Sequence, residues 1–212
     1  MIQVLVVDDH TLVREGLVRL LDMEEDIQVV ADSGSGMGAL HLCQKYKPAV
    51  MVLDYNLPDL DGLEVTRRVV ALGLPTRVLI LTMYASEEYA ARLIRAGASG
   101  FLVKAASTDE LLAGIRKVAE GGVYISPTIM EKMVTRPEDS DQAKPEHSLS
   151  DRELQVLVRL ARGATTREIS ETLELSVSTV ETYRRRIREK LELRNNADLT
   201  RFAIRRGLIS YE

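Results

Sequence analysis

The 212-residue sequence contains no tryptophan, two phenylalanines and a single cysteine. Cys43 has no second cysteine to pair with, and its amphipathic surroundings favour a small buried hydrophobe in a reducing compartment. No apolar run reaches the roughly 20 residues that a membrane helix needs. The opening MIQVLVV has no basic region before Asp8 and Asp9, so it predicts a strand and not a signal peptide. These absences exclude disulfide scaffolds and membrane-spanning proteins, and we expect a cytoplasmic protein with no membrane partner.

Acidic and basic residues nearly balance, with a formal net charge of −4, but they are unevenly distributed. Residues 1–126 hold 12 Lys or Arg against 17 Asp or Glu, a net charge of −5. Residues 127–147 hold 3 against 5, and residues 148–212 hold 13 against 10, so their net charges are −2 and +3. An acidic first part followed by a basic last part indicates that the C-terminal end binds a polyanion such as nucleic acid.

The first 120 residues alternate between short aliphatic runs and longer amphipathic patterns. Continuous runs of Val, Ile and Leu are typical of parallel strands that are buried on both faces. We expect strands over 3–7, 27–31, 49–53, 77–81 and 100–103. We expect helices over 11–23, 35–46, 61–72, 86–97 and 107–120. Five strand–helix units in series predict an α/β fold with an open, doubly wound sheet.

A polar segment follows this alternation. Residues 127–147 carry Pro137 and Pro145 and end without apolar periodicity, so they predict a linker, with TIMEKMV as a candidate short helix. Beyond residue 148 there is no strand pattern, and we expect helices over 151–161, 166–173, 177–192 and 196–206. The chain therefore divides into a domain over 1–126, a linker over 127–147 and a separate all-α, four-helix domain over 148–212.

Polar residues mark the carboxyl ends of four predicted strands. Asp8 and Asp9 follow the first strand, Asp54 the third, Thr82 the fourth and Lys104 the fifth. Ligands of doubly wound sheets bind beyond these ends. Clustered carboxylates repel unless a cation compensates, hard oxygen ligands suit Mg²⁺, and an aspartate is a competent phosphoryl acceptor. The alternative is that each acidic residue is an ordinary helix N-cap, but five matched positions at the ends of four strands favour a site.

The helix expected over 177–192 has an apolar face made by Val180, Tyr183, Ile187 and Leu191. A short helix, a tight turn and this longer helix form a helix-turn-helix arrangement, in which the second helix enters the major groove of DNA. Its basic residues supply contacts to phosphates and bases, although a solvated charged face is the alternative. The residues that we assign to DNA contacts are Thr179, Glu181, Thr182, Arg184, Arg185, Arg188 and Lys190.

The motifs VVDDH, VLDYNLPDLDG and LTMYASEEYAARLIRAGASGFLVK resemble the receiver domains of NarL/FixJ-family response regulators, and the resemblance covers residues 1–121. It implies a flavodoxin-like, five-stranded parallel sheet in the order 2-1-3-4-5. It also implies that Asp54 accepts a phosphoryl group from a sensor histidine kinase. Among the metal ligands, Asp9 would bind Mg²⁺ directly together with Asp54, Asp8 would bind it through water, and Asn56 would bind it with its backbone carbonyl.

The same resemblance assigns Thr82 and Phe101 as a switch pair and Lys104 as a contact to the phosphoryl oxygen. Two positions depart from the common pattern. Ala105 follows the lysine where many receivers have proline, which leaves the geometry of that peptide bond open, and Phe101 stands where tyrosine is common. His10, beside two aspartates, is a candidate metal ligand or pH sensor, but it also fits the start of the first helix, and we favour that role.

Residues 148–208 resemble the LuxR-type helix-turn-helix domain, with these residues in register: Glu153, Gly163, Glu168-Ile169, Ser178-Thr179-Val180, Ile187 and Lys190-Leu191. The likeness implies that Glu181, Thr182 and Arg185 face the bases, and that the last helix packs the domain and supplies a dimer contact. By spacing alone, Glu153 would complete a capping box with Ser150.

These observations predict a two-component response regulator. Mg²⁺-dependent phosphorylation of Asp54 by a histidine kinase would control homodimerisation and binding to double-stranded DNA with paired half-sites, and so regulate transcription. Such a protein catalyses its own phosphorylation but is not a turnover enzyme. A phosphatase of the haloacid-dehalogenase type would need a second aspartate two residues after the nucleophile, where this chain has Asn56. A degenerate receiver would lack some of these site residues, and all of them are present.

Overall fold

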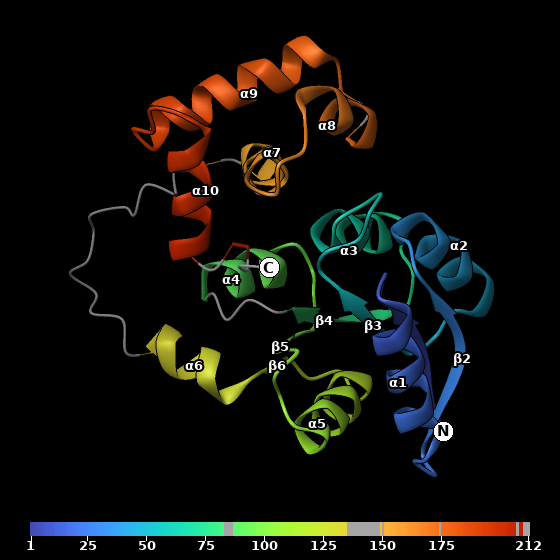
Figure 1. Ribbon diagram of the computed structural model, residues 1–212. Helices are drawn as coiled ribbons and strands as arrows, with labels where there is room; N and C mark the ends of the chain where they lie inside the picture. Colours follow the sequence, from blue (N-terminus) through green and yellow to red (C-terminus); the bar gives the residue numbers. More distant parts are fainter. Residues whose placement is uncertain (83–86, 135–148, 150, 174, 207, 210–212) are drawn as a thin grey trace. The chain divides into compact units, whose positions relative to one another are not determined.

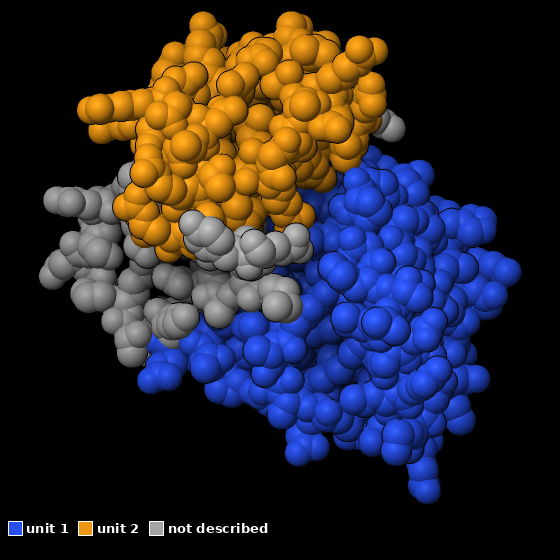
Figure 2. Space-filling model, viewed as in Figure 1, with its two compact units in different colours: residues 1–133 blue, residues 134–212 orange. Residues whose placement is uncertain are grey.

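The structure is a computed structural model that describes residues 1–82, 87–134, 149, 151–173, 175–206 and 208–209. The chain divides into two compact units, Met1–Met133 and Val134–Glu212 (Figure 2). The first unit combines strands and helices, and the described part of the second is helical.

One parallel sheet forms the centre of the first unit (Figure 1). Its strands are β1 (Ile2–Val7), β2 (Ile27–Ser33), β3 (Val50–Asp54), β4 (Arg77–Thr82), β5 (Gly100–Val103) and β6 (Tyr124–Ile125). The order β2-β1-β3-β4-β5-β6 confirms the predicted order of five strands and adds a sixth at the β5 edge. Because β6 contributes only two residues to the ladder, hydrophobic periodicity could not reveal it.

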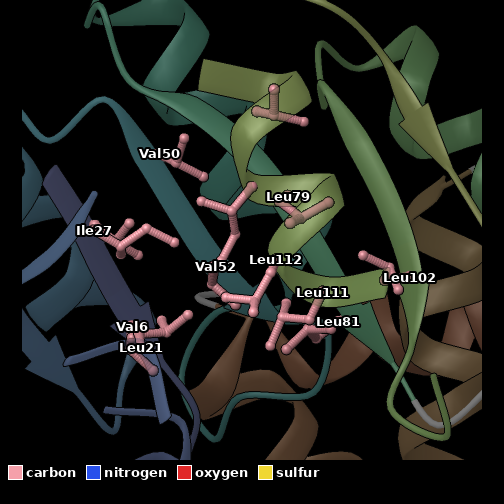
Figure 3. Packing of buried hydrophobic residues seen from close by; sticks show 13 residues of the cluster. Val6, Leu21, Ile27, Val50, Val52, Leu79, Leu81, Leu102, Leu111 and Leu112 are labelled. Carbon is pink, nitrogen blue, oxygen red and sulfur yellow. The ribbon is translucent and has the colours of Figure 1, made fainter. Parts of the chain in front are cut away.

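Five helices cover this sheet: α1 (Thr11–Asp22), α2 (Gly36–Tyr46), α3 (Gly62–Ala71), α4 (Glu87–Arg95) and α5 (Thr108–Ala119). Helices α1 and α5 lie on one face, and α2, α3 and α4 lie on the other (Figure 1). Successive residues of a strand therefore pack alternately against the helices of one face and of the other. Both sets are buried, which explains the continuous apolar runs of the strands. The core beneath α1 and α5 includes Val6, Leu21, Val52, Leu81 and Leu112 (Figure 3).

A capping residue and a glycine determine where α3 begins after β3. The Asp61 side chain accepts a hydrogen bond from the Glu64 backbone N–H at 2.9 Å and so begins α3. A Cβ added to Gly62 would lie 3.0 Å from the Cα of Tyr55, so glycine lets α3 pack closely against the end of β3. This packing holds the loop between Asp54 and Asp61 against the sheet.

Helix α6 (Pro127–Val134) follows β6. It occupies the first eight residues of the segment predicted as a linker, where TIMEKMV indicated a helix. Residues 135–147 of that segment lie outside the described residues.

The second unit contains α7 (Asp151–Ala161), α8 (Thr166–Thr172), α9 (Val177–Lys190) and α10 (Asn196–Arg205), which confirms the four expected helices. Thr165 and Glu168 form a capping box at α8, and Ser176 caps α9. The residues that are fully buried in this unit include Leu157, Ile169, Val180, Ile187 and Leu199. The capping box expected at Ser150 lies outside the described residues.

Candidate functional site

The register of the sheet brings the predicted acidic residues together. Val7 of β1 pairs with Leu53 of β3, so Asp8 and Asp54 follow at the same edge. Both side chains are buried, with exposures of 1% and 3%. Lys104, which follows β5, places its Nζ 2.6 Å from Asp8 Oδ2 and 3.0 Å from Asp54 Oδ2. One ammonium therefore bridges two buried carboxylates from separate strands.

Burial raises the pKa of Asp54, and the charge of Asp8 adds to this, while Lys104 and the Asn56 backbone N–H lower it; the net direction is upward. For Lys104, burial favours the neutral form, but Asp54 and Asp8 outweigh it and raise the lysine pKa above its ordinary value. Lys104 is therefore protonated at neutral pH. The upward pKa shift of Asp54 indicates that this single cation does not fully offset the burial of the carboxylate together with the smaller effect of the Asp8 charge.

Asp9 and His10 lie at the exposed side of the same cluster. The Nδ1 atom of His10 is 2.8 Å from Asp9 Oδ1 and 3.2 Å from Asp8 Oδ1. One ligand atom from each of Asp8, Asp9, His10 and Asp54 fits within a span of 4.8 Å. His10 does begin α1, as expected, but its side chain makes no capping hydrogen bond and turns to the carboxylates. The sequence favours the start of the helix over metal ligation for this histidine, and the structure places its ring in the acidic cluster.

The two predicted switch residues are both enclosed in the first unit. Thr82, the last residue of β4, is 3% exposed, and Phe101 of β5 is completely buried. The Lys104 backbone N–H donates to the Thr82 carbonyl at 2.7 Å, which ties the ends of these two strands together. The Lys104–Ala105 peptide bond is trans. Residues 83–86, which follow Thr82, lie outside the described residues.

Two side chains that the sequence analysis does not identify hold the segments around the cluster: Arg14 contacts Asp8 of the cluster itself, and Asp59 joins the segment after β3 to α2. Arg14 of α1 donates to the Asp8 carbonyl at 2.6 Å and to the Asp32 carboxylate at 2.8 Å. Asp59 accepts hydrogen bonds from the first two backbone N–H groups of α2, both at 2.8 Å. Burial raises the pKa of Asp59, but backbone hydrogen bonds, these two foremost, outweigh it and lower the pKa below the ordinary value. The bonds from Arg14 to Asp32 and from α2 to Asp59 join groups at least 18 residues apart in the sequence, so spacing alone carries no signal for them.

Helix α9 presents the charged face predicted for the second unit. Val180 and Ile187 are fully buried, and Tyr183 is half-buried. Glu181 is exposed, and the Arg185 side chain is 70% exposed. Both charged residues help to line a groove on this face. Its lining residues are Glu181, Arg184, Arg185, Arg188, Glu189, Glu192 and Leu193.

Other predicted DNA contacts have partners inside the unit. The Thr182 hydroxyl donates to the Ser178 carbonyl at 2.9 Å. Arg184 contacts Glu181 at 3.4 Å and Asn196 at 3.1 Å. Thr179 contacts Ser176, with 2.7 Å between the hydroxyl oxygens. These contacts hold the side chains along the N-terminal half of α9.

Side chains in the C-terminal half of α9 also have partners inside the unit. The Arg188 guanidinium donates to the carbonyls of Leu193 and Arg194 in the turn after the helix. Lys190 Nζ lies 2.7 Å from a carboxylate oxygen of Glu153, whose side chain is only 3% exposed. Glu153 therefore stabilises the C-terminal end of α9, a role that its capping-box spacing did not predict.

Comparison with known families decides what these two units are. The family model for the response regulator receiver domain matches residues 4–116, and the model for bacterial regulatory proteins of the luxR family matches residues 147–203. The chain is a response regulator of the NarL/FixJ family. This response regulator joins a receiver domain to a LuxR-type DNA-binding domain and regulates transcription.

Curated relatives match the response regulator along its whole length. It is 38% identical to the response regulator GacA of Pseudomonas aeruginosa, over 99% of this chain and 98% of the relative. It is 37% identical to the response regulator UvrY of Escherichia coli K12, over 100% of this chain and 98% of the relative. The solved receiver domain of NarL from Mycobacterium tuberculosis is 36% identical with a TM-score of 0.55, and the match covers 57% of this chain and 97% of that one. Among the described residues, no helix has the length and apolar character needed to cross a membrane.

Proposed function

We propose that this response regulator accepts a phosphoryl group on Asp54 from a sensor histidine kinase, and that the phosphorylated protein dimerises on promoter DNA. The observation that carries the proposal is the Asp54 carboxylate, buried beside Asp8 and 3.0 Å from Lys104 Nζ. A buried carboxylate with an adjacent cation is suited to attack phosphorus and to hold the charge that arrives with the phosphoryl group.

In the transfer, a carboxylate oxygen of Asp54 attacks the phosphorus of a phosphohistidine. The new O–P bond forms as the P–N bond breaks, and the kinase imidazole leaves with the bonding electron pair. Lys104, already in contact with Asp54, then donates to a phosphoryl oxygen. Thr82, at the end of the neighbouring strand, supplies a hydroxyl to another phosphoryl oxygen and forms the switch pair with Phe101.

The oxygen donors fit a divalent metal, because carboxylate oxygens of Asp8, Asp9 and Asp54 converge and burial raises the pKa of Asp54 despite Lys104. Asp9, Asp54 and the Asn56 carbonyl would hold Mg²⁺ directly, and Asp8 would hold it through water. Bound there, Mg²⁺ would neutralise part of the charge on the phosphoryl oxygens. Asp54 is itself modified, so the protein is a phosphorylation-controlled switch and not a turnover enzyme.

We place the receiver domain at 1–126, the linker at 127–147 and the DNA-binding domain at 148–212. Helix α9 enters the major groove as the second helix of the α8–α9 helix-turn-helix. The exposed Arg185 and Glu181, with Thr182, face base edges, and Arg188 and Lys190 lie further along, where phosphates pass. Thr179 and Arg184 complete the contact face. A dimer would place two such helices on paired half-sites about one helical turn apart.

Incubation with a small phosphodonor and MgCl2, followed by borohydride trapping and mass spectrometry, tests the modification. We expect a single label on Asp54, its loss in Asp54→Ala, and its retention in Asp109→Ala, which removes an exposed aspartate of α5. Label that persists in Asp54→Ala would contradict the assignment. Light scattering with and without beryllofluoride tests dimerisation, and equal masses would reject it.

A further inference from the structure

The acidic cluster includes a nitrogen donor that the proposed magnesium site does not use. His10 Nδ1 lies 2.8 Å from Asp9 Oδ1 and 3.2 Å from Asp8 Oδ1, and all three residues share a 4.8 Å cluster with Asp54. Helix capping does not explain this orientation, because the His10 side chain makes no capping hydrogen bond. The imidazole of this residue, which directly precedes α1, therefore points to the carboxylates.

The separation between His10 and Asp9 suits two ligands of one metal ion. Two ligands at neighbouring corners of an octahedron lie about 3 Å apart when each bond is about 2.1 Å long. The 2.8 Å between His10 Nδ1 and Asp9 Oδ1 is close to that value, and Asp9 is a carboxylate that would bind the metal directly. The His10 backbone N–H donates to Asp8 Oδ1 at 2.8 Å, which keeps the residue beside the cluster. Its side chain is 65% exposed, so coordination would not require burying the ring.

We propose that His10 is a specificity-determining ligand, through which this site binds divalent transition ions such as Ni²⁺ more tightly, relative to Mg²⁺, than its carboxylates alone would. The inference rests on the proposed metal site. Mg²⁺ prefers oxygen ligands and retains its waters, so it gains little from an imidazole nitrogen. Ni²⁺ accepts imidazole readily and binds mixed nitrogen and oxygen sites strongly. Transition ions would then compete with Mg²⁺ at the phosphorylation site.

Calorimetric titration of the tag-free, full-length protein with MgCl2 or NiCl2 alone tests this selectivity. Wild type is compared with His10→Ala and with His41→Ala, a matched control on the exposed side of α2 and outside the cluster. We expect His10→Ala to lower Ni²⁺ affinity at least about tenfold. Its Mg²⁺ affinity should change less than about twofold, and His41→Ala should change neither. Equal losses for the two ions, or no loss for Ni²⁺, would overturn the proposal.

Asp9→Asn separates this inference from the proposed metal site. It should weaken Mg²⁺ and Ni²⁺ binding alike. If it changes neither, the metal site itself is wrong; if it weakens both while His10→Ala weakens neither, only the role of His10 fails. Nitrogen-15 NMR gives an independent readout, because direct coordination of Zn²⁺ should shift the His10 Nδ1 resonance strongly. An unshifted resonance in the Zn²⁺-saturated protein would reduce His10 to a hydrogen-bonding neighbour of the carboxylates.

Discussion

Replacing Lys104 by methionine tests the electrostatics of the Asp54 site most directly. The substitution keeps a long side chain but removes the ammonium that lies 2.6 Å from Asp8 and 3.0 Å from Asp54. All three side chains are at most 12% exposed, so solvent screens their charges weakly. Removing one partner from a buried ionic group costs about 3 to 5 kcal/mol. We expect the free energy of unfolding of the first unit to fall by that amount at neutral pH.

The loss should depend on pH, with a sign that follows from the pKa of Asp54. Lys104 lowers this pKa against the effects of burial and Asp8, so Lys104→Met should raise it further. A carboxyl group with a raised folded-state pKa binds its proton more tightly in the folded protein. Its stability contribution therefore falls as the pH rises from the ordinary aspartate value of 3.8 toward the folded-state pKa. The loss of free energy of unfolding in Lys104→Met, relative to wild type, should therefore be complete at about pH 7.5 and much smaller at about pH 4.5.

Urea unfolding of the full chain, followed by far-UV circular dichroism without divalent ions, measures the effect. A loss of 3 to 5 kcal/mol should lower the midpoint of the first unit by roughly 2 M. Lys117→Met, the same substitution at an exposed position of α5, is the matched control and should cost less than about 0.5 kcal/mol. If Lys104→Met unfolds at the same urea concentration as wild type at pH 7.5, then Lys104 does not compensate these carboxylates and the reasoning is refuted.

Two further predictions concern α9. Arg185→Ala should weaken the free energy of binding to a specific duplex by about 1 to 3 kcal/mol and change binding to a scrambled duplex little. Arg188→Ala should weaken binding to both duplexes and make the affinity less dependent on salt concentration. Binding titrations at several salt concentrations distinguish base contacts from phosphate contacts. If Arg185→Ala loses affinity equally for both duplexes, Arg185 is a phosphate contact. Lys190→Met removes the cation beside buried Glu153 and should destabilise the second unit by about 3 kcal/mol, with recovery in the Glu153→Gln double variant. Unchanged thermal unfolding would refute this stabilising role of Lys190 and leave it only the proposed contact to phosphates.

The sequence by itself determined the main elements and the acidic site. Continuous apolar runs located β1 to β5, because a parallel strand buried on both faces must be apolar at successive positions. The site followed from topology, since parallel strands end at one edge of the sheet and carry Asp8, Asp54 and Lys104 to the same place. The family resemblance supplied the strand order, which the sheet confirms and extends by β6.

Only the tertiary structure decided which partners the long polar side chains take. Lys190 lies on the charged half of α9, yet it bonds to Glu153 of α7, 37 residues earlier in the chain. Arg14 of α1 likewise donates to Asp32 of β2, 18 residues later in the chain. Helical spacing defines the direction in which a side chain leaves the backbone. The partner within reach of a flexible side chain depends on which other elements pack nearby, and that information is distributed over the whole fold.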